Sequence, residues 1–178
     1  MELIAPKKLF HVSESRHIKI FEPRPADFYP TIRQSVVFAI TETLLHNYLL
    51  PRDCPRVTYY AGRQTSDEDR KTFFGMSTAA YVVAVESRWL PDILRTTLFC
   101  YEMPSDSFFL LDNCAGYYIS YVPVTPVSVR PVYSILEELL KKGTVELRFL
   151  PELHQLANAV KRSSLQFSLI RMINLPPL

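Results

Sequence analysis

The chain has 178 residues, of which 48% are hydrophobic and 21% charged, and its formal net charge is +2. This composition is typical of a folded globular protein and excludes an intrinsically disordered chain. Only 4 residues are Gly, whereas 14 are Pro. The four glycines are far apart in the sequence, so they cannot build a Walker-type phosphate loop or a Gly-rich dinucleotide turn. Any nucleotide site must therefore be formed by strand side chains and aromatic rings.

Charge, cysteines and hydropathy indicate where the protein works. Its 20 basic and 18 acidic residues argue against a dedicated nucleic-acid binder. The three cysteines are widely spaced and no signal peptide is recognisable at residues 1–10, which predicts reduced thiols and a cytoplasmic location. The uncharged stretches are too short or too interrupted by Pro to cross a bilayer, so we expect a soluble protein without a membrane partner.

The first half of the chain shows strand patterns separated by short helices. Apolar and β-branched runs predict strands at residues 8–13, 18–21, 35–40, 56–60 and 81–86. Short helices are expected at 43–50 and 87–94. Ser66 and Asp69 have the spacing of a capping box, which predicts the start of another short helix.

The second half continues this alternation. Strands are expected at residues 97–103, 107–111, 117–122 and 144–149. Pro131 suits the first position of a helix over 132–142 that Gly143 ends, and a C-terminal helix is expected at 151–162. Strands cluster in the middle with helices at intervals, so we predict an α+β fold: a single domain over 1–178 with a largely antiparallel sheet and short flanking helices.

Metal and nucleophile motifs are missing from the sequence. The four histidines form no His-Glu-x-x-His motif and the cysteines no Cys-x-x-Cys motif, so no metal site is predicted. No serine has the flanks of a Gly-x-Ser-x-Gly elbow. Cys100 and Cys114 lie in apolar surroundings, which favours buried small side chains over reactive thiols.

His11 is the strongest candidate for a binding residue. It lies in the middle of the first expected strand, with Ser13 on the same face and a polar run that includes Arg16 directly after it. Imidazole and hydroxyl groups two residues apart on a strand can both reach the hydroxyls of one ligand. The alternative is that His11 is an ordinary structural histidine within the strand.

Aromatic and acidic residues supply further candidates. The many tyrosines could line a pocket for a planar ring, or they could be ordinary half-buried strand residues. Glu86 ends one expected strand and Glu102 lies near the end of another, where active-site carboxylates are often found.

Three segments resemble ADP-ribosyltransferase-like proteins. They are Leu9-Phe10-His11-Val12-Ser13, then Val36 to Thr41 with the short helix ending at Tyr48, and finally Gly116-Tyr117-Tyr118-Ile119-Ser120 followed by a Pro-containing run. In that superfamily the first segment carries a His or Arg that binds NAD. The second builds the nicotinamide pocket, and the third brings the catalytic Glu. The chain also resembles a family of short, uncharacterised bacterial proteins.

The resemblance implies roles for particular residues. His11 would meet the nicotinamide side of NAD with support from Ser13, and Tyr48 would stack on the ring. Tyr117 stands where the family has its Glu, and a neutral phenol cannot stabilise the oxocarbenium-like state. Either Glu86, the candidate we name as catalytic, or Glu102 serves instead, or catalysis differs, or the pocket binds without transfer.

Two functions follow as hypotheses. The first is an enzyme that uses NAD for ADP-ribosyl transfer or for removal of a 2′-phosphate from RNA; in the second of these reactions Arg16 and Arg56 could matter. The alternative is a non-catalytic interaction module that kept the fold and lost the catalytic Glu. A small-molecule nucleotide is the expected ligand in the first case, and a protein partner of unknown kind in the second.

Overall fold

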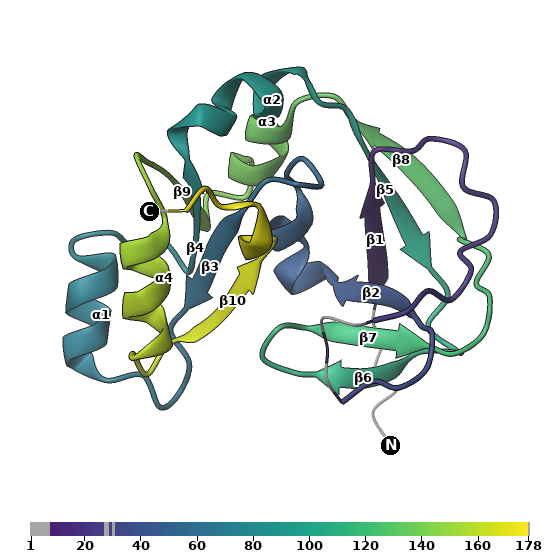
Figure 1. Cartoon of the computed structure of the whole chain (residues 1–178), viewed down its shortest axis with the longest axis horizontal. Helices are drawn as coiled ribbons and strands as arrows, with labels where there is room; N and C mark the ends of the chain where they lie inside the picture. The colour runs from purple at the N-terminus through teal and green to yellow at the C-terminus, as the bar shows by residue number, and fades with distance from the viewer. Residues whose placement is uncertain (1–7, 27–28, 30, 178) are drawn as a thin grey trace. The chain divides into compact units, whose positions relative to one another are not determined.

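The computed structural model describes residues 8–26, 29 and 31–177 of the chain. These residues form a mixed fold of short helices and mostly antiparallel strands, as the sequence predicts (Figure 1). The described strands make one six-stranded and one four-stranded sheet. The chain divides into two compact units, one around each sheet, and each unit consists of two separate chain segments. A single domain over 1–178 stays a prediction.

The six-stranded unit contains the residues up to Leu45 together with Leu98–Val132. Its sheet order is β6-β7-β2-β1-β5-β8, and every neighbouring pair is antiparallel. Numbered in chain order within this sheet alone, the strands run 4-5-2-1-3-6. The strands are β1 (Leu9–Ser13), β2 (Val37–Thr41), β5 (Leu98–Met103), β6 (Phe109–Asp112), β7 (Tyr117–Ser120) and β8 (Ser128–Val132).

The two faces of this sheet carry different apolar clusters. On one face Leu9, Ala39 and Tyr101 pack with Phe21 and Val124, whose main chains form an isolated bridge. The second cluster belongs to the opposite face and contains Ala26, Val36 and Ile119. Because strand side chains alternate between faces, each residue of these strands can be assigned to one face or the other.

Gly116 makes the turn into β7 possible. Its φ of 68° is in the left-handed region, where a residue with a Cβ is strained. A Cβ at this position would lie 2.7 Å from the Thr41 Oγ1 and 3.0 Å from the Leu44 Cδ1. The backbone of β7 therefore approaches the end of β2 more closely than any side chain would allow.

The four-stranded unit contains His46–Thr97 and Tyr133–Leu178. Its sheet order is β10-β3-β4-β9, with β4 and β9 parallel and the other pairs antiparallel. The strands are β3 (Arg56–Tyr60), β4 (Tyr81–Glu86), β9 (Val145–Leu150) and β10 (Gln166–Ile170). Its α-helices are α1 (Asp67–Phe74), α2 (Leu90–Arg95), α3 (Ile135–Leu140) and α4 (His154–Lys161), with 3-10 turns η2 (Ser87–Trp89) and η3 (Met172–Asn174). The 3-10 helix η1 (Glu42–Tyr48) links the two units.

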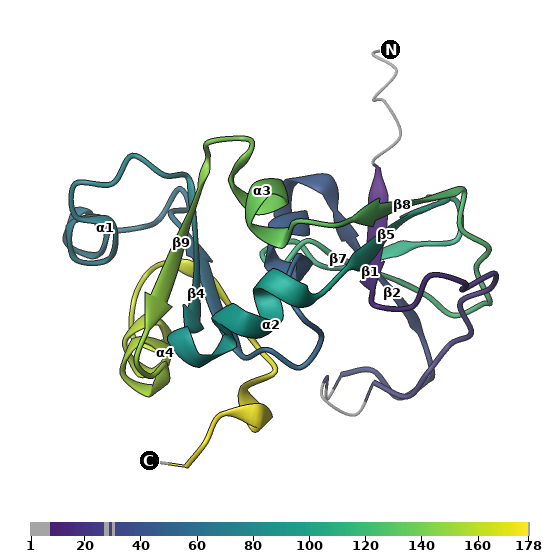
Figure 2. The ribbon, with the colours of Figure 1, turned by 90° about the horizontal axis from the view of Figure 1, so that it is seen from above.

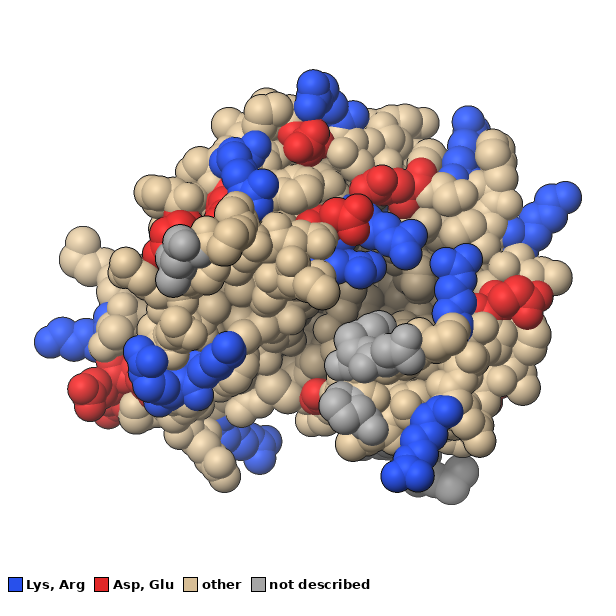
Figure 3. All heavy atoms as spheres, viewed as in Figure 1, with Lys and Arg blue, Asp and Glu red and all other residues tan. Residues whose placement is uncertain are grey.

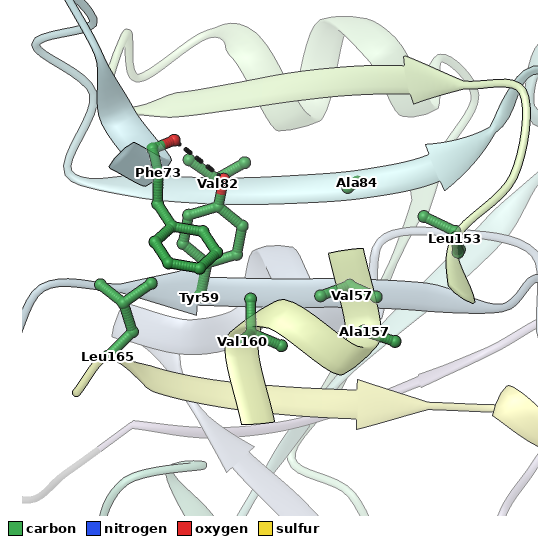
Figure 4. Packing of buried hydrophobic residues seen from close by; sticks show 9 residues of the cluster. All are labelled: Val57, Tyr59, Phe73, Val82, Ala84, Leu153, Ala157, Val160 and Leu165. Carbon is green, nitrogen blue, oxygen red and sulfur yellow. Dashed lines mark hydrogen bonds between the residues drawn. The ribbon is translucent and has the colours of Figure 1, made fainter. Parts of the chain in front are cut away.

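Helices cover both sides of the four-stranded sheet. Figure 2 shows α1 and α4 on one side of this sheet and α2 and α3 on the other. Val57 and Tyr59 of β3 pack against Phe73 of α1 and against Ala157 and Val160 of α4 (Figure 4). Burial of a side chain such as Val57, Phe73 or Val160 stabilises the fold by roughly 1.5–3 kcal/mol.

Several sequence predictions match the observed elements closely. The strands expected at 56–60 and 81–86 are confirmed as β3 and β4. The capping box is confirmed too, because the Ser66 Oγ accepts a hydrogen bond of 3.1 Å from the Asp69 N–H at the start of α1. The helix expected at 43–50 is a 3-10 helix rather than an α-helix.

Other predictions are wrong at the level of single elements. Residues 18–21 form one bridge at Phe21 and no strand. Pro131 lies in the edge strand β8, not in a helix, because an edge strand tolerates a missing N–H. The helix expected at 132–142 is confined to Ile135–Leu140, where Ser134 is the N-cap. β10 was not predicted, although Gln166, Phe167, Ser168 and Leu169 alternate between polar and apolar as in a half-buried strand.

The face of the molecule seen in Figure 3 has no patch of a single charge, because basic and acidic residues are interspersed on it.

Among the described helices, none is both long and apolar enough to cross a membrane.

Candidate functional site

β1 holds His11 in the middle of the six-stranded sheet, with β2 on one side and β5 on the other. The imidazole is half-buried, and its centroid lies 4.7 Å from the ring of Phe21. The His11 Nδ1 is 2.8 Å from the Phe38 carbonyl oxygen. A carbonyl oxygen can only accept a hydrogen bond, so Nδ1 must be the protonated nitrogen that donates this bond. In the neutral ring Nε2 is then the unprotonated nitrogen.

Ser13 and Arg16 lie at the end of β1, where the chain leaves the sheet. The Ser13 Oγ accepts a hydrogen bond of 3.1 Å from the Ser15 N–H. The Tyr101 hydroxyl donates to the Ser15 carbonyl at 2.7 Å and accepts from the Ile18 N–H at 3.2 Å. Arg16 is exposed in this turn. Ser13 therefore helps to hold the turn, and Tyr101 fixes it to β5.

Tyr117 does not share a face with His11. The register of β1 and β2 pairs Leu9 with Thr41 and Phe10 with Ile40, so by alternation His11 is on the same side of the sheet as Ala39, and Ala39 lies opposite Tyr118 of β7. Residues opposite each other in an antiparallel pair point to the same side, so the tyrosine on the face of His11 is Tyr118. Tyr117 is opposite Ile40 and points to the other side of the sheet. A role for Tyr117 in binding stays a prediction.

A carboxylate that the sequence analysis missed lies beside Tyr117. Asp112 of β6 is opposite Tyr117, next to an irregularity in the pairing of β6 with β7. Its Oδ2 accepts a hydrogen bond of 2.8 Å from the Tyr29 hydroxyl, and its Oδ1 accepts from the N–H groups of Cys114 and Ala115. Burial, and then the bond to Asp112, raise the pKa of Tyr29 to about 12. The signal for this turn is the Asp-Asn pair before Gly116, because Asp side chains often bond to the backbone two residues on.

Tyr48 lies at the end of η1 and belongs to the four-stranded unit. The guanidinium of Arg56 lies over the Tyr48 ring, 5.5 Å from its centroid. Arg56 is only 2% exposed and donates from one nitrogen to the carbonyls of Pro51 and Cys54, at 3.1 and 2.9 Å. One face of the Tyr48 ring is thus occupied by a cation of the same unit.

Glu86 also belongs to the four-stranded unit, at the end of β4. Its side chain is 4% exposed and its Oε2 accepts a hydrogen bond of 2.6 Å from the Arg88 Nε. Arg88 in turn donates to the Asn174 carbonyl at 3.4 Å. This geometry is that of an ion pair at the edge of a core. Tyr48 and Glu86 therefore lie in one unit, whereas His11, Ser13, Arg16 and Tyr117 lie in the other.

The described strands of the six-stranded sheet place no carboxylate on the face of His11. Glu102 is opposite Phe10 and so points to the other side, where its Oε2 accepts from the Ser128 hydroxyl at 3.3 Å. Among the described strand positions on the face of His11, none is Asp or Glu. The nearest polar side chains on that face are the hydroxyls of Ser13, Tyr101 and Tyr118.

Cys54 has little nucleophilic character. Cys54 is fully buried, and burial raises the pKa of its thiol to about 12. Cys100 is 2% exposed and Cys114 is half-buried, and none of the three forms a disulfide. In the part of the chain that the structure describes, His, Cys, Asp and Glu form no group of three able to hold a metal ion.

A comparison with protein-family models gives one match. The model of DUF6886, described as a family of unknown function, matches residues 10–175. The chain belongs to the DUF6886 family. No curated protein and no solved structure matches it significantly. The matched span includes His11 and both units of this DUF6886 protein.

Proposed function

We propose that the six-stranded unit has an ADP-ribosyltransferase-like fold and binds the nicotinamide-ribose part of NAD, or a related nucleotide, beside His11. The observation that carries the proposal is the position of the three resembling segments. They form β1, β2 and β7, which are consecutive neighbours in one sheet. His11, Ala39 and Tyr118 then stand in one row across one face.

The chemistry of this row suits a ribose and a flat ring. The hydrogen bond from Nδ1 to the Phe38 carbonyl holds the His11 ring in one orientation, and an imidazole is a group that can bond to ribose hydroxyls. Phe21 packs beside the imidazole with ring centroids 4.7 Å apart, and Tyr118 adds an aromatic face and a hydroxyl on the same side of the sheet. Tyr101 fixes the turn after β1 and thereby the chain that borders the row.

The same row favours binding without transfer. NAD supplies a bond between nicotinamide and ribose whose cleavage develops positive charge on the ribose. A carboxylate close to that ribose would stabilise the charge. On the face of His11 the described strands supply hydroxyls instead, and Glu86 is held by Arg88 in the other unit. The proposed function is therefore that of a nucleotide-binding module without transferase activity.

Calorimetric titration with NAD tests the binding. We expect saturable binding at millimolar NAD and a loss of at least about tenfold in affinity in His11→Ala, because a hydrogen bond to the ligand disappears. His17→Ala is the matched control, since His17 is exposed and lies six residues further on. Absence of heat with the folded wild-type protein, or equal affinities of His11→Ala and wild type, would overturn the proposal.

Release of nicotinamide tests the lack of transfer. We expect the purified protein to release no more nicotinamide from NAD than a buffer blank does. Release that disappears in His11→Ala would show that the protein is an enzyme. The variants Glu86→Gln and Glu102→Gln would then identify which carboxylate takes part.

A further inference from the structure

The four-stranded unit contains a groove that the proposed function does not use. It has a volume of about 580 Å³ and lies between α1 and the adjoining ends of β3 and β4. This volume is within the usual range of roughly 300–1,000 Å³ for small-molecule sites. All of its lining residues belong to the four-stranded unit.

Aromatic rings form one part of the groove. Tyr60 and Tyr81 are cross-strand partners at the ends of β3 and β4, with ring centroids 5.6 Å apart and planes tilted by 57°. The ring of His46, which is 9% exposed, lies 4.6 Å from that of Tyr81 and supports it. Phe74 adds a third half-buried ring from the last turn of α1. A flat ligand ring can stack on such surfaces.

Charged groups of α1 form another part. Arg70 uses one nitrogen to donate to the Gly62 carbonyl at 3.0 Å, which fixes its guanidinium at the groove. Lys71 lines the groove too, and its ammonium has no partner among the described residues. Asp67 is the one described acidic side chain in the lining, so the charge of the groove is positive. This balance favours an anionic ligand.

Hydroxyl groups complete the lining. Ser77 and Thr78 border the groove, and the Tyr81 hydroxyl has no hydrogen-bond partner among the residues that the structure describes. The Ser77 Oγ accepts from the Ala79 N–H at 3.2 Å, which shapes the loop before β4. Hydroxyls and the Asp67 carboxylate can bond to the sugar hydroxyls or ring amines of a ligand.

Rings, cations and hydroxyls in one groove match the three parts of a nucleotide. We propose that this groove binds a nucleoside monophosphate group: the base stacks on Tyr60 and Tyr81, and the phosphate contacts Lys71 and Arg70. Such a group can be a free nucleotide or the 5′-phosphorylated end of an RNA strand, and both present the same chemistry. The groove shares no lining residue with the row of His11, Ala39 and Tyr118, and the inference does not depend on the proposed function.

Titration with AMP and with a 5′-phosphorylated RNA tetranucleotide tests the groove, with adenosine as the probe that lacks phosphate. We expect saturable binding of AMP, weaker binding of adenosine, and a loss of about tenfold for AMP in Lys71→Gln. Lys142→Gln is the matched control, since Lys142 is exposed in the same unit outside the groove. Tighter binding of the tetranucleotide than of AMP would identify an RNA end as the ligand, and the reverse a free nucleotide.

Three results would overturn the inference: no saturable binding of either phosphate probe, equal affinity for AMP and adenosine, or an unchanged affinity in Lys71→Gln. Tyr81→Leu gives a second readout, because it removes a stacking ring and should lower the affinity for AMP by about tenfold. The variants also separate this inference from the proposed function. His11→Ala changes the proposed NAD site alone, because His11 is not among the residues that line the groove. If Lys71→Gln lowers the affinity for NAD and His11→Ala does not, the result supports nucleotide binding in the groove and contradicts the proposed site at His11.

Discussion

The two units of the molecule use polar side chains in different ways. In the four-stranded unit Arg56 and Glu86 are almost fully buried, and both are held by partners of the same unit. In the six-stranded unit His11 and Tyr118 are half-buried on the sheet face that packs against Phe21, and the described strands place no carboxylate on that face. A buried charge at the end of a strand is thus a structural feature here, whereas the less buried imidazole is the better binding candidate.

The largest expected effect comes from Arg56→Ala. It removes a buried guanidinium and leaves the carbonyls of Pro51 and Cys54 without their donor. We expect a loss of about 4 kcal/mol in the free energy of unfolding. Urea denaturation followed by the fluorescence of Trp89, the single tryptophan, measures it in the same unit. Arg16→Ala, at an exposed position of the other unit, should change the free energy of unfolding little. A similar loss in both variants would contradict the structural role of the buried Arg56.

Gly116→Ala tests how much a close backbone approach contributes to the stability of the six-stranded unit. Both Gly116 and Gly143 have positive φ, but only at Gly116 would a Cβ meet other atoms within 4 Å. We expect losses of about 3 kcal/mol for Gly116→Ala and about 1 kcal/mol for Gly143→Ala. Urea denaturation measures both losses, and the rate at which the buried Cys100 thiol is alkylated reports opening of the six-stranded unit, to which only Gly116 of the two belongs. Equal losses in the two variants would mean that the backbone conformation alone, and not the close approach to β2, makes Gly116 necessary.

Tyr59→Phe tests whether neutral polar groups in the four-stranded core are structural as well. The Tyr59 hydroxyl donates to the Phe73 carbonyl at 3.1 Å and accepts from Arg148 at 2.7 Å. We expect a loss of about 1.5 kcal/mol in unfolding free energy, because both partners lose a bond. Tyr133→Phe is the matched control, since Tyr133 is 76% exposed in the same unit. A loss of unfolding free energy in Tyr59→Phe no larger than that in Tyr133→Phe would contradict the structural role of the Tyr59 hydroxyl.

The smallest effect concerns acid stability. Hydrogen bonds from the Ser164 side chain and N–H lower the pKa of Asp69. A carboxylate with a lowered pKa stabilises the folded state above its unfolded pKa, about 4, and this contribution disappears as the pH falls through the folded value. Asp69→Asn should therefore lower the urea midpoint at pH 7 and narrow the difference between pH 7 and pH 3. Glu68→Gln, on the exposed side of α1, should leave that difference unchanged; an equal narrowing in both variants would contradict the prediction.

Local patterns were enough to predict the strands with continuous apolar runs. Arg56–Tyr60 and Tyr81–Glu86 are confirmed to the residue, because β-branched and aromatic residues fill them and turns flank them. The capping box at Ser66 is confirmed for the same local reason. β10 escaped prediction because its pairing with β3 comes from residues about a hundred positions away.

The candidate site shows the same limit. The sequence placed His11 and Ser13 on one face of one strand, and this follows from alternation alone. It could not show which of Tyr117 and Tyr118 shares that face, because the register between β2 and β7 depends on Gly116 and the turn before it. Nor could it show that Glu86 has Arg88 as its partner, since either residue could have turned to solvent.

The division of each unit into two chain segments has a consequence for synthesis. The six-stranded sheet is complete once Val132 has been made, whereas β3 and β4 need β9 and β10, which end at Ile170. Residues 46–97 therefore emerge from the ribosome with two paired strands whose outer edges have no neighbours yet. Unpaired apolar edges are the surfaces that chaperones protect and that aggregates recruit. The order of the elements along the chain thus makes the four-stranded unit the later and more vulnerable half of the nascent protein.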